Sequence, residues 1–359
     1  MSRTCVYNLP ALFLTIWFML PVPLSSAGVT VNFEPQGGFD FSGTAGKAIN
    51  YAAAYLNRQA AAGPDGQALS LSGSYYELNL YIQSVNQDLQ RFNQCTQCSE
   101  ETHDLGGPPG TASESYKAAL DYLARHLRQS PGDLDLQTAV AVISLGSSRQ
   151  NAQRRFERMV STNPSSAIGH CFLAYLALHE EDQSGFGTHF EEAIQADPTY
   201  VPAYNSLAMF YNNLGKSDEA LRVLTQGLAR FPNEATFFYN QAYIHARQHR
   251  WDAAQVSLQN AVTRQPTQEN QLMLGMVLLK RQDYRNAQTV FESMLDMNPK
   301  DVLALLGLAT SYKKRHHFAM AISLTEQAVA IDPANQEIQT ELQEHKEAHE
   351  QWKSQQKEK

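Results

Sequence analysis

The alternation of apolar, small and polar residues predicts paired helices along most of the chain. The stretch YNNLGKSDEALRVL, Tyr211 to Leu224, is rich in helix formers, yet its fifth residue is Gly215 and its tenth is Ala220. Large apolar residues lie at both ends. The pattern predicts two amphipathic helices joined by a tight turn at Gly215, with Ala220 where the helices approach each other closely.

Prolines show that this arrangement recurs at a fixed period. Seven of them fall 33 or 34 residues apart, at Pro131, Pro164, Pro198, Pro232, Pro266, Pro299 and Pro333. Proline cannot continue a helix interior, so each one ends a helical pattern and begins a tight connection. The prolines delimit six units of two helices each, at residues 133–166, 167–200, 201–234, 235–267, 268–301 and 302–335.

Small residues mark two positions in these units. The eighth position holds Val140, Ala174, Ala208, Ala242, Gly275 and Ala309, and the twentieth holds Ala152, Phe186, Ala220, Ala254, Ala287 and Ala321. Small side chains there let two antiparallel helices pack closely, while bulky residues fill the space around the crossing. Phe186 departs from the pattern and is flanked by Gly185 and Gly187, so the second helix of unit 167–200 is predicted to start late or to pack wide.

This register resembles the tetratricopeptide repeat, a helix-turn-helix unit of about 34 residues. Unit 201–234 matches best, with Tyr204, Leu207, Ala208, Tyr211, Gly215, Ala220, Leu224 and Pro232 where the family has its signature. The resemblance implies an all-α fold, a right-handed superhelical solenoid of such units. It also implies a concave groove lined by the first helices.

Carrying the groove positions of the family onto this sequence gives a set of candidate partner-binding residues, the predicted groove set. Its members are Tyr175, Asn205, Met209, Asn212, Asn213, Tyr239, Tyr243, Arg247, Leu272, Met276, Lys280, Leu306, Lys313 and Lys314. Apolar and aromatic members offer anchors, and asparagines offer donors and acceptors to a peptide backbone.

The cations of the set favour a protein or peptide partner with acidic residues, although surface lysines that happen to align are an equal alternative. Asn240 fits one place of the clamp with which some family members grip the carboxylate of a chaperone tail. Glu269 and Met273 occupy the places where the next repeat should offer bases, so that function is rejected.

The N-terminus predicts export. Arg3 precedes the apolar run ALFLTIWFML, residues 11–20, and the small residues SSAG follow, as in a signal peptide of residues 1–27 cleaved after Ala27. An uncleaved membrane anchor is the alternative. No Asn-x-Ser/Thr site follows and no KDEL-type ending is present, which favours the periplasm over the extracellular space or the endoplasmic reticulum lumen.

Two further regions flank the repeats. Residues 28–132 predict a divergent helical region, with helices at 75–93 and 115–130 separated by a loop that contains HDLGGPPG. Residues 336–359 predict a capping helix and a polar tail, because Ile338, Leu342, His345 and Trp352 form a lone apolar stripe that can cover the last repeat.

Cys95 and Cys98 form the motif CTQC, the most tempting site for chemistry. In an oxidising compartment a local disulfide between them is favoured. Free thiols, pairing with Cys171, and a metal site completed by His103 stay open, and so does a redox or metal-binding module carried by the repeats. Three carboxylates in SEETHD follow the motif and would raise the thiol pKa, which disfavours a redox enzyme.

Net charge and the absence of catalytic motifs argue against several classes of function. The net charge is -8 and the pI about 5.8, which argues against nucleic-acid binding. No phosphate loop or nucleophile elbow occurs in the sequence, and HKEAH at His345–His349 lacks a zinc-protease glutamate and is interpreted as a hydrated helix face. We therefore expect no enzyme, cofactor or metal. The leading hypothesis is an exported scaffold that holds a protein partner during assembly or transport of an envelope complex; self-association through the groove is a further possibility.

Overall fold

The structure is a computed structural model that describes residues 20–23, 30–33, 35–38, 44, 47–48, 114–145, 149–179 and 183–357. These fall in two compact units. The first includes residues 38–207 and the second residues 17–37 and 208–359. The CTQC motif, the helix predicted at 75–93 and the apolar run before Leu20 lie outside the described residues.

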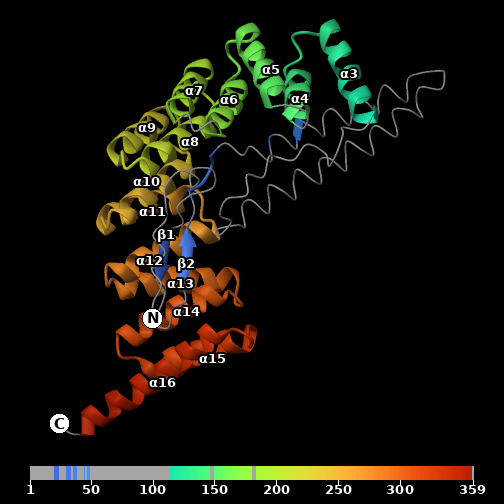
Figure 1. The fold of residues 1–359 in the computed structure, drawn as a ribbon. Helices are drawn as coiled ribbons and strands as arrows, with labels where there is room; N and C mark the ends of the chain where they lie inside the picture. The colour runs from blue at the N-terminus through green and yellow to red at the C-terminus, as the bar shows by residue number, and fades with distance from the viewer. Residues whose placement is uncertain are drawn as a thin grey trace, which may run out of the picture. The chain divides into compact units, whose positions relative to one another are not determined.

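The first unit is a stack of helix pairs in which each helix contacts the next, from α3 to α7 (Figure 1). Its helices are α3 Glu114–Gln129, α4 Leu134–Leu145, α5 Arg149–Thr162, α6 Ala167–His179 and α7 Gln183–Ala196, followed by the start of α8 Val201–Asn213. Contacts between neighbours in sequence are the signature of a repeat stack, in which each pair buries its apolar face on the next.

The second unit continues the same pattern and adds a hairpin. Its helices are α9 Ser217–Arg230, α10 Ala235–Arg247, α11 Trp251–Arg264, α12 Gln268–Lys280, α13 Tyr284–Met297, α14 Val302–Lys314, α15 Phe318–Ile331 and α16 Gln336–Lys357. The antiparallel strands β1 Leu20–Pro23 and β2 Thr30–Phe33 pair with each other, and β1 contacts α10. β1 thus lies within the predicted signal peptide.

The predicted small positions form the core of both units. Ala152 and Ala174 of the first unit are fully buried, and so are Ala208, Ala220, Ala254 and Ala287 of the second, as the close approach of paired helices requires. The all-α class is confirmed. Among the described residues, no helix has the length and hydropathy that a membrane span needs.

The prediction of a late second helix in unit 167–200 is wrong. α7 begins at Gln183, the seventeenth position of its unit, as do α9 at Ser217 and α11 at Trp251. Phe186 thus replaces the small residue without delaying the helix, and Gly187 after it is buried. Phe186 itself is half-buried and packs edge-on against Phe190, with ring centroids 4.9 Å apart.

The turns between paired helices share a left-handed residue. Gly215 has φ 76°, and His249, Gln282 and His316 take its place in the next three units with φ 58°, 60° and 62°. Glycine adopts this conformation without strain, whereas a residue with a Cβ atom does so at a cost of about 1 kcal/mol. Three of these four turns therefore carry a strained residue.

α16 packs on α15 and covers the end of the second unit through a polar cluster as well as apolar residues. Ile338, Glu341 and His345 are buried, and His345 Nδ1 lies 2.9 Å from the Thr325 hydroxyl. The interpretation of His345 as part of a hydrated face is therefore wrong. Burial, with the nearby Lys313 ammonium, lowers the pKa of His345 to about 4, although Glu344 acts in the opposite direction.

Candidate functional site

The strongest candidate site is the face of α10 where Asn240 holds the backbone of Gln36. The Gln36 amide donates a hydrogen bond to Asn240 Oδ1, and the Asn240 side-chain amide donates one to the Gln36 carbonyl, both at 2.8 Å. The two residues are 204 positions apart in sequence, and both belong to the second unit. Asn240 therefore binds main chain through a reciprocal pair that requires no particular side chain at Gln36.

The local structure explains why Asn240 can do this. It is fully buried within α10, so its rotamer is fixed by packing. One residue before it, the Tyr239 hydroxyl donates a hydrogen bond to Glu269 Oε1 at 3.0 Å, which ties α10 to the next first helix, α12. On the other side of the contact, Gly37 has φ 66° and turns the bound segment immediately after Gln36. Asn240 is thus preorganised by its packing in α10, and the segment that it binds bends immediately after Gln36.

The predicted groove set is largely buried in the structure. Tyr175 and Asn205 lie in the first unit and the others in the second. The buried members are Asn205, Met209, Asn212, Tyr239, Tyr243, Leu272, Met276 and Leu306. Tyr175, Asn213, Arg247, Lys280 and Lys313 are half-buried, and Lys314 is exposed. Two parts of the chain itself, β1 and Gln36, contact α10. The role of this set in binding stays a prediction.

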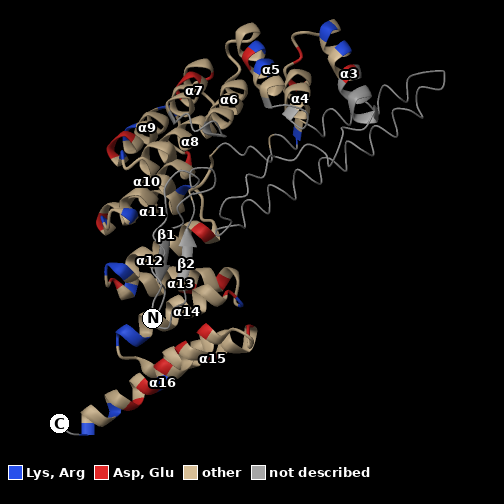
Figure 2. Ribbon diagram, viewed as in Figure 1, with Lys and Arg blue, Asp and Glu red and all other residues tan. Residues whose placement is uncertain are grey.

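Cations gather at the ends of two first helices of the second unit. Lys280 closes α12, and Lys313 and Lys314 close α14; Figure 2 shows basic residues at both helix ends. Burial, together with the Lys314 ammonium, lowers the pKa of Lys280. Lys313 is paired with Glu344, with its Nζ 3.6 Å from Oε2. The neighbouring charges of Lys280 and Lys314 form a small electropositive site that a carboxylate would stabilise.

Arg247 differs from these lysines in its surroundings. Its guanidinium lies over the ring of Tyr243, 5.9 Å from the centroid. This cation–π contact holds the charge against α10 itself. The cations predicted from sequence thus have three different environments. Arg247 lies over an aromatic ring, and Lys313 makes an ion pair with Glu344. Lys280 and Lys314 repel each other electrostatically.

The cysteine chemistry is only partly visible in the described residues. Cys171 is buried and carries a free thiol, and burial raises the pKa of that thiol. A thiol that stays protonated in an apolar interior is a poor nucleophile and a poor metal ligand. Cys95 and Cys98 lie outside the described residues, so their pairing stays a prediction.

Sequence reasoning placed Asn240 in a rejected carboxylate clamp and did not identify Gln36 at all. The amide on a first helix was a visible signal, because a buried asparagine needs partners for both of its polar atoms. The segment that supplies those partners lies in another part of the chain, and no local pattern pointed to it.

Models of the tetratricopeptide repeat match residues 189–222, 211–269 and 278–343 of the chain. Among curated proteins, superkiller protein 3 of Schizosaccharomyces pombe is 24% identical over 155 residues, which are 40% of this chain and 11% of that protein. The chain thus matches about a tenth of the length of that relative.

Among the solved structures that resemble the chain, one has a TM-score above 0.5 and supports the fold. The C-terminal part of a tetratricopeptide-repeat protein from Cytophaga hutchinsonii is 15% identical, covers 63% of this chain and 94% of its own, and has a TM-score of 0.52. YrrB, described as a tetratricopeptide protein with an unusual peptide-binding site, is 18% identical, with coverage of 52% and 96% and a TM-score of 0.43. Yeast Tom70 is 13% identical, with coverage of 87% and 82% and a TM-score of 0.42.

Proposed function

Because the chain is a tetratricopeptide repeat protein and carries a protein-interaction scaffold, we propose that it binds a main-chain segment of a protein partner on the first-helix face of its second unit. The observation that carries the proposal is the Asn240 clamp on the Gln36 backbone. In this proposal the partner segment takes the position that Gln36 occupies.

Main-chain recognition would fix the register in which such a partner binds, and the lysines would select for negative charge on it. Asn240 would hold the main-chain N–H and C=O of one residue of the segment, and the predicted neighbours Tyr243, Leu272 and Met276 would contact its apolar side chains. Lys280 and Lys314 favour a carboxylate on the same segment, because among the described residues neither lysine makes an ion pair. The partner is therefore an apolar segment with acidic residues.

We further propose that the protein works after export, in assembly or transport of an envelope complex. The apolar run at residues 11–20 and the small residues before position 28 support this proposal. In this proposal the scaffold acts by binding its protein partner.

The test compares Asn240→Ala with Asn260→Ala, a half-buried asparagine whose side chain bonds to Val256 and Arg264 of its own helix, α11. Tagged chains are used for affinity capture from the native compartment, with and without an excess of a synthetic peptide of residues 30–37. We expect the peptide and Asn240→Ala each to remove the specific partner, and Asn260→Ala to retain it. Loss of two hydrogen bonds corresponds to roughly 1–3 kcal/mol, or about 5- to 150-fold in affinity.

Hydrogen exchange gives an independent measurement on the protein alone. The amide of Gln36 should exchange faster in Asn240→Ala than in Asn260→Ala, because its acceptor is removed. A partner that binds Asn240→Ala as tightly as the unmodified chain would refute the proposed position of the groove.

A further inference from the structure

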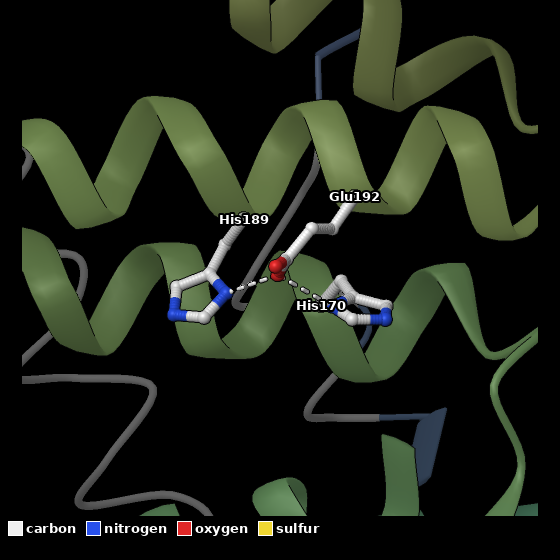
Figure 3. Close-up of side chains that lie close together, drawn as sticks. All are labelled: His170, His189 and Glu192. Carbon is white, nitrogen blue, oxygen red and sulfur yellow. Dashed lines mark hydrogen bonds and ion pairs between the residues drawn. The ribbon is translucent and has the colours of Figure 1, made fainter. Parts of the chain in front are cut away.

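Two histidines and one glutamate converge between α6 and α7 in the first unit. His170 projects from α6, and His189 and Glu192 project from α7, one helical turn apart (Figure 3). One ligand atom of each residue lies within 4.8 Å of the other two. All three side chains retain access to solvent, with exposed fractions of 14%, 30% and 42%.

The Nδ1 atoms of both histidines lie near a single carboxylate oxygen. His189 Nδ1 lies 2.8 Å from Glu192 Oε2, and His170 Nδ1 lies 3.2 Å from the same atom. Four ligands at about 2.0–2.1 Å from a tetrahedral ion are separated by about 3.3 Å from one another. Two of the three separations in the cluster are therefore already close to those of a metal site.

Hydrogen bonding within the cluster is incomplete. His189 Nδ1 makes a hydrogen bond to Glu192, but His170 Nδ1 is buried and has no well-directed partner. Burial is the main cause that lowers the pKa of His170, although the Glu192 carboxylate acts in the opposite direction. A neutral His170 has a lone pair on one of its ring nitrogens, which is the form that binds metals.

A cation explains this arrangement better than a hydrogen-bonded bridge between helices. If the His170 lone pair is on Nδ1, it faces the lone pairs of a carboxylate, which repel it. If the proton is on Nδ1, the hydrogen bond it makes is poorly directed. A bound cation would accept electron pairs from both imidazoles and from the carboxylate, and all three groups would gain from it.

We propose that His170, His189 and Glu192 form a binding site for a divalent transition-metal ion of the zinc class. Two nitrogen ligands and one oxygen ligand suit zinc and its neighbours, whereas calcium and magnesium require oxygen ligands. Three protein ligands leave a fourth position for water. Because the ligands come from both helices of one repeat, the ion joins α6 to α7.

Cobalt titration of the full-length protein tests the site. After treatment with a chelator, one Co²⁺ per chain should bind and give visible d–d bands, without the charge-transfer band of a thiolate ligand. Glu192→Gln should weaken binding at least about 10-fold, and so should His170→Gln. Glu192→Gln preserves size and lies at a partly exposed position, so it keeps the test valid if His170→Gln does not fold.

Two controls separate this cluster from other candidate ligands. His317→Gln changes an exposed histidine of the second unit and should leave cobalt binding unaltered. A chain with Cys95→Ser and Cys98→Ser should retain the same spectrum, because no cysteine belongs to the cluster. Zn²⁺ should raise the Tm of both controls and leave that of Glu192→Gln nearly unchanged.

The proposal is overturned by either of two results. One is the absence of stoichiometric cobalt or zinc uptake by the unmodified chain. The other is uptake that persists in Glu192→Gln and His170→Gln but disappears in the double cysteine variant, which would place the ion at the CTQC motif.

Discussion

Phe291 occupies a slot between two glycines, and this slot predicts a large effect of one methyl group. The ring is fully buried on α13, with Gly275 of α12 and Gly307 of α14 beside it. A Cβ atom added at Gly307 would lie 2.5 and 2.7 Å from the two Cε atoms and closer still to Cζ. A Cβ atom added at Gly275 would lie 2.6 Å from Cζ. The ring therefore has little space on either of these sides.

The expected cost of Gly307→Ala follows from these distances. Carbon atoms pack best at about 3.5–4.0 Å, so the ring would have to shift by about 1 Å. Overpacking of this kind costs roughly 1–3 kcal/mol, and the crowding at Gly275 favours the upper end. Alanine regains up to about 1 kcal/mol over glycine within a helix. We expect Gly307→Ala to lower the free energy of unfolding by roughly 1–2 kcal/mol.

Urea denaturation followed by far-ultraviolet circular dichroism measures this change. Gly132→Ala is the matched control, because an added Cβ atom there meets no atom within 4 Å. Combining Gly307→Ala with Phe291→Leu should cost less than the sum of the single changes, since the smaller side chain vacates part of the slot. If Gly307→Ala is as stable as the unmodified protein or more so, the close approach of α14 to Phe291 is wrong.

Three other predictions rest on features of the second unit. Gly215→Ala should destabilise by about 1 kcal/mol and Gln282→Gly should stabilise by up to about 1 kcal/mol, measured by the same denaturation, because both sit at the left-handed turn position. The folded pKa of His345, about 4, lies below the unfolded value of about 6.5, so its stabilisation is present above pH 6.5 and is lost as the pH falls to about 4. This loss is of the order of 3 kcal/mol and should shrink in His345→Gln when unfolding is measured against pH. Lys280→Glu with Lys314→Glu should weaken partner binding at low salt without lowering the Tm; unchanged affinity would contradict the predicted acidic partner.

Much of the fold was predictable because each repeat carries its own local signals. Prolines fix where helices end, and small residues such as Ala220 and Ala254 fix where they cross. The error at α7 came from reading Phe186 and its flanking glycines as a break in the helix. A short-range rule failed there because the Phe186 ring packs against Phe190 of the same helix, a contact that the rule did not consider.

The sites were less predictable because they depend on long-range placement. His189 and Glu192 are a visible pair one helical turn apart, but the position of His170 relative to them requires the crossing of α6 and α7. Asn240 and Gln36 are 204 residues apart. His345 lies on a predicted apolar stripe, yet its depth depends on how α16 sits on α15. Sequence patterns describe one element at a time, whereas these contacts join two.

The predicted signal-peptide cleavage would affect the hairpin formed by β1 and β2. Ala27, after which cleavage is predicted, falls in the sequence between β1, which ends at Pro23, and β2, which begins at Thr30. Processing at that bond would cut β2 loose from its partner and leave Gln36 near a new chain end. An uncleaved precursor would then keep the α10 face covered by its own hairpin. After removal of residues 1–27, a partner segment could displace Gln36 from that face more easily.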